Sequence, residues 1–241
     1  MRARYVDVIL CVVVAVFSTT QAFATKNILF IFDASGSMSA QMPEGTKIDI
    51  ARRVLSERVQ NLPDSGIDAG LVVYGHRRKG DCGDIEQRMK LKPLNKKALI
   101  ESVQSIHPKG KTPIAASIRL AVDQLKELED ETTIILISDG QETCDADPCA
   151  VVQQLKDTGI KFRLHVIGFD VNKEERRQLE CLAKAGGGEY VPAPTAGKLD
   201  EALRALTTPI VTAMGEGAGK LRNHPRYLIG YAEALRGGDK T

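Results

Sequence analysis

Residues 27–37 have the sequence NILFIFDASGS. The continuous apolar run is typical of a central parallel strand that is covered on both faces. Directly after it, Asp33 supplies a carboxylate, and Ser35 and Ser37 supply hydroxyls on a glycine-containing turn. Hard oxygen ligands of this kind suit a hard divalent cation. One acid and two neutral hydroxyls under-neutralise a dication, so the segment predicts a metal site that binds a further anionic ligand through the metal.

The first 24 residues have the features of a secretory signal peptide. Arg2 and Arg4 precede an apolar run from Val8 to Phe17, and Ala22-Phe23-Ala24 forms a small-x-small cleavage pattern. The run is shorter than the about 20 apolar residues of a membrane span; an uncleaved N-terminal anchor is the alternative. The sequence therefore predicts a signal peptide over 1–24, one domain over 25–214 and a loosely attached, glycine-containing tail over 215–241.

Charge and cysteine usage narrow the class of protein. With a formal net charge of +2, the chain lacks the strong excess of basic residues that is typical of a nucleic-acid binder. Four cysteines follow the signal peptide, an even number that suits an oxidising compartment. Four cysteines allow three pairings, and the short loop between Cys144 and Cys149 favours that pair, with Cys82 and Cys181 remaining. We therefore expect an exported protein, periplasmic or extracellular, without a membrane span in the mature chain.

Strand and helix patterns alternate along the mature chain. Alternation of this kind predicts a doubly wound, mostly parallel α/β sheet with helices on both faces, whose ligands bind at the carboxyl ends of the strands. An alternating apolar pattern over residues 84–91 predicts an edge strand, the antiparallel one of this sheet. Further strands are predicted at 27–32, 69–74, 132–138, 162–169 and 189–192, and helices at 48–62, 95–106, 113–128, 148–158, 173–185 and 199–214.

Two more oxygen ligands fall at the same predicted edge. Thr112 opens a helix before Pro113, and Asp139 follows the apolar strand 132–138. Each has an ordinary structural explanation, because threonine before proline is a good helix N-cap and Asp-Gly is a common turn. Ser35 or Ser37 could likewise cap a helix or close a turn. Their convergence on one sheet edge favours a shared site.

This set of five residues resembles the metal-ion-dependent adhesion site of von Willebrand factor type A (VWA) domains, and the order of strands and helices is similar to that family from about 27 to 214. The resemblance implies a Rossmann-like VWA fold. It also implies that Ser35, Ser37 and Thr112 bind the metal directly, while Asp33 and Asp139 act largely through water. Mg²⁺ is the metal that the resemblance implies, with Mn²⁺ or Ca²⁺ possible, and an acidic residue of a partner protein would complete the coordination.

Basic residues lie in two loops, one that follows the strand 69–74 and one that contains Gly110 and Thr112. If these loops lie around the metal, they form a positive rim that steers an acidic ligand; the alternative is an ordinary solvated loop. The candidate rim residues are His76, Arg77, Arg78, Lys109 and Lys111.

These observations predict an exported, metal-dependent binding protein of the adhesion or assembly type, and not an enzyme. Two alternatives remain: a metal-assisted hydrolase, for which no general base is evident near the site, and a structural subunit of an envelope complex. In the family that the chain resembles, ligand binding can be coupled to movement of the last helix, here 199–214. That coupling is a hypothesis for this chain.

Overall fold

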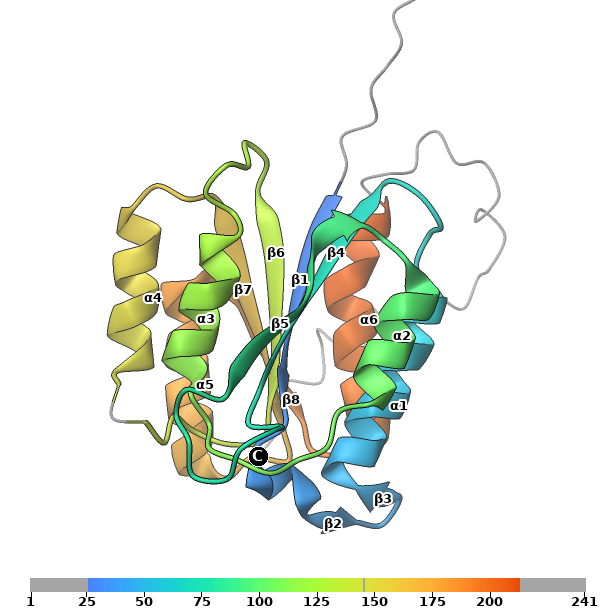
Figure 1. Cartoon of the computed structure of the whole chain (residues 1–241), viewed down its shortest axis with the longest axis vertical. Helices are drawn as coiled ribbons and strands as arrows, with labels where there is room; N and C mark the ends of the chain where they lie inside the picture. The colour runs from blue at the N-terminus through green and yellow to red at the C-terminus, as the bar shows by residue number, and fades with distance from the viewer. Residues whose placement is uncertain (1–25, 145, 213–241) are drawn as a thin grey trace, which may run out of the picture.

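The computed structural model describes residues 26–144 and 146–212. The predicted signal peptide, the predicted tail and the last two residues of the predicted helix 199–214 lie outside the described residues. A six-stranded sheet forms the centre of the domain, in the order β5-β4-β1-β6-β7-β8 (Figure 1). Its strands are β1 (Lys26–Asp33), β4 (Ile67–Tyr74), β5 (Ile85–Pro93), β6 (Thr132–Ser138), β7 (Phe162–Phe169) and β8 (Gly187–Ala193).

The sheet has the predicted topology. β1 lies between β4 and β6 and pairs with both in parallel, while β5 pairs with β4 in the antiparallel sense at the edge. Helices cover both faces, with α1, α2 and α6 on one side and α3, α4 and α5 on the other (Figure 1). The helices are α1 (Lys47–Gln60), α2 (Lys96–Gln104), α3 (Ile114–Asp123), α4 (Pro148–Asp157), α5 (Lys173–Ala185) and α6 (Ala196–Thr212).

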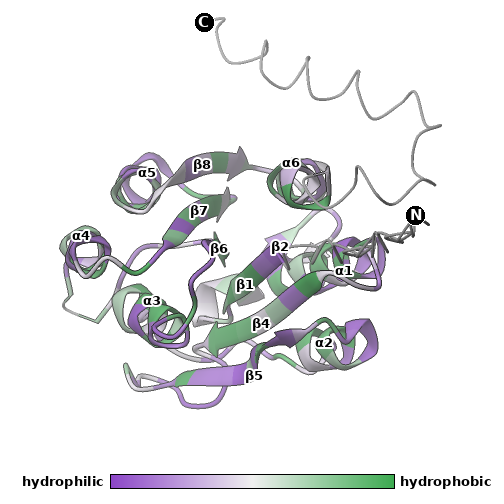
Figure 2. Ribbon diagram, turned by 90° about the horizontal axis from the view of Figure 1, so that it is seen from above, coloured by the Kyte–Doolittle hydropathy of each residue, from purple (hydrophilic) through white to green (hydrophobic). Residues whose placement is uncertain are grey.

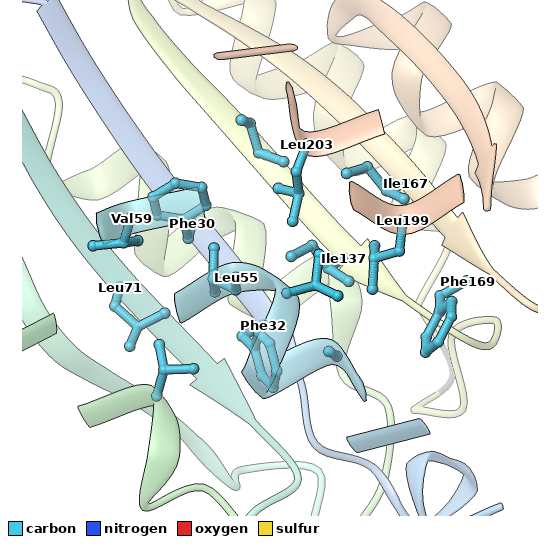
Figure 3. Close-up of a cluster of buried hydrophobic side chains, with 14 of the residues drawn as sticks. Phe30, Phe32, Leu55, Val59, Leu71, Ile137, Ile167, Phe169, Leu199 and Leu203 are labelled. Atoms are coloured by element: carbon cyan, nitrogen blue, oxygen red, sulfur yellow. The ribbon is translucent and has the colours of Figure 1, made fainter. Parts of the chain in front are cut away.

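The apolar run of β1 divides between the two cores. Phe30 and Phe32 are fully buried with residues of α1 and α6 on one face, as Figure 3 shows. Leu29 and Ile31 are buried on the opposite face with residues of α3, α4 and α5. The hydropathy of a strand follows its place in the sheet. The inner strand β4 is mostly hydrophobic, and the edge strand β5 is mostly hydrophilic (Figure 2). β1 therefore packs against a core on each face, and these tightly packed cores fix the position of the turn that follows it.

Some boundaries differ from those predicted. α3 ends at Asp123. After it, the N–H groups of Gln124, Leu125 and Leu128 donate to the carbonyl three residues earlier, as in a 3₁₀ helix, and not four residues earlier. Leu125 stays buried in those turns, which explains why the apolar spacing extends further than the α-helix. The 3₁₀ helix η1 (Gly36–Ser39) and the hairpin of β2 (Gln41–Met42) and β3 (Gly45–Thr46) were not predicted.

The glycine triplet 186–188 ends one helix and begins the next strand. Gly186 caps α5, whereas Gly187 and Gly188 already belong to β8. Gly187 has a φ of 68°, and a Cβ on Gly188 would lie 2.1 Å from the Leu164 carbonyl oxygen of β7. Glycine is required here because the chain turns sharply and then approaches β7 closely. β8 therefore begins two residues earlier than predicted.

Candidate metal site

Four of the five predicted metal ligands form one hydrogen-bonded chain at the C-terminal ends of β1 and β6. The Asp33 Oδ1 accepts a hydrogen bond from the Ser35 backbone N–H at 2.8 Å. The Oγ atoms of Ser35 and Ser37 lie 3.0 Å apart, and the Ser37 hydroxyl donates to Asp139 Oδ1 at 2.7 Å. Residues 102 positions apart in the sequence are thus brought together by the parallel pairing of β1 with β6.

The serine hydroxyls are not used for helix capping. Ser35 is the N-cap residue of η1, but its side chain makes no capping hydrogen bond. The Ser35 and Ser37 hydroxyls point instead toward each other and toward Asp139. The capping interpretation of these two serines therefore does not describe what their hydroxyls do.

Two buried hydroxyls orient the Asp33 carboxylate, one directly and one through the other. Ser138 donates to Asp33 Oδ2 at 2.7 Å, and Tyr74 donates to Ser138 Oγ at 3.1 Å. Burial and the Asp33 carboxylate raise the pKa of the Tyr74 phenol, which therefore stays protonated and able to donate. Tyr74 ends β4 and Ser138 ends β6, so the strands on either side of β1 both orient its carboxylate.

Thr112 is placed beside the site by backbone hydrogen bonds of the loop that contains it. Gly110 pairs with Ser35 as an isolated parallel bridge, and the Gly36 N–H donates to the Gly110 carbonyl at 3.0 Å. Thr112 is buried, and its N–H donates to Thr143 Oγ1 at 2.8 Å. The N-cap residue of α3 is Pro113, so Thr112 does not cap that helix as its sequence position suggests.

The protonation of Asp139 depends on its buried surroundings. Burial and the nearby Asp33 carboxylate raise the pKa of Asp139 to about 6, although Ser37 and Lys47 act in the opposite direction. Lys47 Nζ lies 3.2 Å from Asp139 Oδ2. Lys47 begins α1, and sequence analysis missed it because a lysine at the start of a helix is normally solvated. A cation at this site would relieve the repulsion between the two carboxylates.

The donor set fits a hard divalent cation. Asp33, Ser35, Thr112 and Asp139 are all buried, and Ser37 is hydrogen bonded to two of them. Every candidate donor is a carboxylate or hydroxyl oxygen, as Mg²⁺ prefers. Within residues 26–144 and 146–212, no group of three or more histidine, cysteine or acidic side chains could hold a metal. Any metal at this edge would therefore depend on the hydroxyls of the motif.

The candidate rim is less uniform than the sequence indicates. The His76 side chain is almost enclosed, with Nε2 2.7 Å from Glu86 Oε2, and burial lowers its pKa. Arg77 and Arg78 are tied to acids of their own loop, Asp84 and Asp81. Lys109 and Lys111 are exposed on either side of Gly110, and no described residue forms an ion pair with them. These two lysines are the free positive charges of the predicted rim in the described part of the chain.

The disulfides differ from the favoured pairing. Cys82 is bonded to Cys144, and Cys149 to Cys181. The first bond joins the β4–β5 loop to the loop after Asp139, and the second joins α4 to α5. A pairing of Cys144 with Cys149 was wrong, because Cys149 lies in the first turn of α4 and is directed to the neighbouring helix. Loops that are distant in sequence meet at the sheet edge, which sequence separation does not reveal.

The family model for the von Willebrand factor type A domain matches residues 27–204. The fold and the arrangement of the motif residues agree with that match, and the chain belongs to the VWA family. None of the helices in the described part of the chain is long and apolar enough to cross a membrane.

The chain also has similar relatives in sequence and in fold. The chain is 32% identical to the uncharacterized protein YwmC of Bacillus subtilis over 185 residues, which cover 73% of this chain and 80% of YwmC. It is similar in fold to an aerotolerance-related membrane protein of Bacteroides fragilis, with a TM-score of 0.61, 19% identity, and coverage of 79% and 99% of the two chains. The minor pilin PilB of Streptococcus sanguinis gives a TM-score of 0.66 at 15% identity, with 83% and 64% covered.

Proposed function

We propose that this chain is an exported VWA protein that binds another protein through a divalent cation, and that it is not an enzyme. The observation that carries the proposal is the convergence of Asp33, Ser35, Ser37 and Asp139 in one hydrogen-bonded chain at the carboxyl edge of the sheet. Thr112 would complete the ligand set. Mg²⁺ suits these ligands, and Mn²⁺ or Ca²⁺ are alternatives. The metal would supply a Lewis-acidic position for an acidic side chain of the partner.

Export is supported by the two disulfides of the domain. Both disulfides lie in the described domain, and disulfides persist in oxidising compartments. A role in adhesion or assembly is supported by the fold, since the minor pilin PilB has the same architecture. The periplasm or the cell exterior would be the site of action.

Titration of Mg²⁺ into chelator-treated protein tests the metal site. We expect one-site binding in the wild type and at least about a tenfold loss of affinity in Ser37→Ala, because the variant removes a ligand and the hydrogen bond to Asp139. Ser39→Ala is the matched control, since Ser39 is exposed in the same 3₁₀ helix. Calorimetry gives both affinities. Equal binding by wild type and Ser37→Ala would contradict the assignment.

A second experiment tests the binding mode. Envelope extract is passed over immobilised wild-type protein with Mg²⁺ or with EDTA, and over Ser37→Ala with Mg²⁺. A partner engaged through the metal is retained only by the wild type with Mg²⁺. A partner retained equally in all three conditions would show that binding does not use the metal.

The lysines of the rim are expected to act on the rate of association. Replacing Lys109 and Lys111 together by glutamate should slow binding of the captured partner by about tenfold at low salt, because the free positive charges beside Gly110 are reversed. Lys97→Glu is the control, since Lys97 is exposed on α2. Surface plasmon resonance at two salt concentrations measures the effect. An association rate that is unchanged at low salt would assign these lysines to solvation alone.

A further inference from the structure

Lys47 is a buried cation in direct contact with the candidate metal site. Its Nζ lies 3.2 Å from Asp139 Oδ2 and 3.1 Å from Asp170 Oδ2, and it donates a hydrogen bond to the Asp170 carbonyl at 3.1 Å. Only 8% of the residue is exposed. Lysine is rarely buried to this extent unless it is paired. The three contacts supply the pairing that this position needs.

The chain adopts an unusual backbone conformation to make these contacts. Asp170 follows β7 with a φ of 51°, in the left-handed region that residues other than glycine rarely adopt. Its N–H donates to the Ala193 carbonyl of β8 at 3.0 Å, which fixes the turn. In this conformation both the carbonyl and the carboxylate of Asp170 contact Lys47. The end of β7 is thereby arranged to hold an ammonium group beside Asp139.

The charges of the site explain what this ammonium does. Asp33 and Asp139 are both buried, and they are joined through Ser35 and Ser37 by one chain of hydrogen bonds. The Lys47 ammonium is paired with the carboxylates of Asp139 and Asp170. A lysine that is paired in this way carries its ordinary positive charge at neutral pH. The buried part of the site, with two carboxylates and one ammonium, carries a net charge of −1.

We propose that Lys47 is a built-in counter-charge of this site, which holds Asp139 in place and weakens the binding of a divalent cation. Its effect on metal binding rests on the proposed function. An ammonium beside Asp139 repels an incoming dication, because like charges a few ångströms apart are only weakly screened at a buried site. The remaining charge of −1 under-neutralises Mg²⁺. A carboxylate from the partner would then add the missing charge, so metal and partner would bind more tightly together than separately.

The test compares three variants of the full mature chain at pH 8. Lys47→Met keeps most of the length of the side chain and removes its charge, so we expect it to bind Mg²⁺ about tenfold or more tightly than the wild type. Lys47→Arg keeps the charge and should stay within about threefold of the wild type. Asp170→Asn tolerates the left-handed backbone but removes a carboxylate beside Lys47, and it should bind Mg²⁺ several-fold more weakly, on the same Coulombic grounds.

Thermal unfolding with EDTA provides a readout that does not depend on metal. Lys47→Met leaves two buried carboxylates without their cation and should have a lower Tm than Lys47→Arg. Tighter Mg²⁺ binding by Lys47→Met together with this lower Tm supports the proposal. Wild-type or weaker Mg²⁺ affinity in a folded Lys47→Met overturns it and leaves the metal site standing. If the wild type binds neither Mg²⁺ nor Mn²⁺, the proposed function fails, and equal Tm values in EDTA would then overturn the counter-charge as well.

Discussion

Replacing Gly75 by alanine is expected to abolish Mg²⁺ binding and to lower the free energy of unfolding by more than about 3 kcal/mol. Gly75 follows β4 with a φ of 69°, a conformation that costs an alanine roughly 1–2 kcal/mol. A Cβ at this position would also lie 2.5 Å from the Lys111 carbonyl oxygen and 2.9 Å from the Ser35 Cα. Both neighbours are backbone atoms of the candidate metal site, and neither can move without displacing a ligand.

Gly75 also ties the loops of the site together. Its carbonyl accepts hydrogen bonds from the Lys109 N–H at 2.9 Å and the Gly110 N–H at 2.7 Å, and its N–H donates to the Asp84 carbonyl at 2.8 Å. The loop that leads to Thr112 is therefore positioned on Gly75.

Gly159→Ala is the matched control for this prediction. Gly159 has a similar φ of 80°, but a Cβ there would have no atom within 4 Å. We expect it to cost about 1 kcal/mol from the backbone alone and to leave Mg²⁺ affinity unchanged. Chemical denaturation and calorimetry on both variants separate the cost of the backbone conformation from the effect of the steric contact on the site. Wild-type Mg²⁺ binding by Gly75→Ala would show that the close approach of this loop does not shape the site.

The sequence predicts the fold because the signals that define it are local and long. β6, β7 and α5 have the predicted bounds. β6 contains a continuous apolar run, β7 alternates apolar and polar residues before an apolar end, and α5 is a capped amphipathic helix. The hairpin at 41–46 escapes prediction because its strands have two residues each and no measurable alternation. The positions of Asp33, Ser35, Ser37 and Asp139 follow from the topology, because parallel strands deliver their C-terminal ends to one edge.

The supporting residues of the site could not be predicted in the same way. Lys47 begins a helix, and its burial is explained by its contacts with Asp139 and with Asp170, which follow two strands distant in the sequence. Tyr74 ends an apolar strand and is indistinguishable in sequence from a core residue, yet its hydroxyl reaches Ser138. These contacts join elements that are far apart in the chain. A pattern in one segment carries no information about them.

Loss of the Cys82–Cys144 disulfide is expected to weaken Mg²⁺ binding by about 10- to 100-fold, the range typical of residues that support metal ligands. Cys144 lies at the end of the loop that follows Asp139, and its neighbour Thr143 accepts the Thr112 N–H and donates to the Thr112 carbonyl at 3.2 Å. Glu142 of the same loop accepts the Ala115 N–H at the start of α3. The disulfide thus anchors a loop that positions both Asp139 and Thr112.

The second disulfide provides an internal control, because it is expected to stabilise the fold by a similar free energy. Cys149–Cys181 closes a separation of 32 residues and Cys82–Cys144 one of 62. In the chain-entropy model both stabilise the fold by about 4 kcal/mol, because the dependence on loop length is logarithmic. The two double variants, with serine in place of each cysteine, should therefore lose similar stability. Cys149→Ser with Cys181→Ser, which loosens α4 against α5, should keep its Mg²⁺ affinity within about twofold, because it leaves the Cys82–Cys144 bond and the hydrogen bonds between Thr112 and Thr143 in place.

Measuring both double variants below their unfolding transitions, with circular dichroism as the check on folding, separates a local effect from a global one. Thr143→Val adds a variant that keeps both disulfides and removes the hydroxyl that accepts the Thr112 N–H. We expect it to weaken Mg²⁺ binding in the same direction as loss of Cys82–Cys144. If the two double variants lose Mg²⁺ affinity equally, the disulfides act only through the stability of the domain. A selective loss in the Cys82–Cys144 variant and in Thr143→Val instead identifies the loop after Asp139 as the element that positions Thr112.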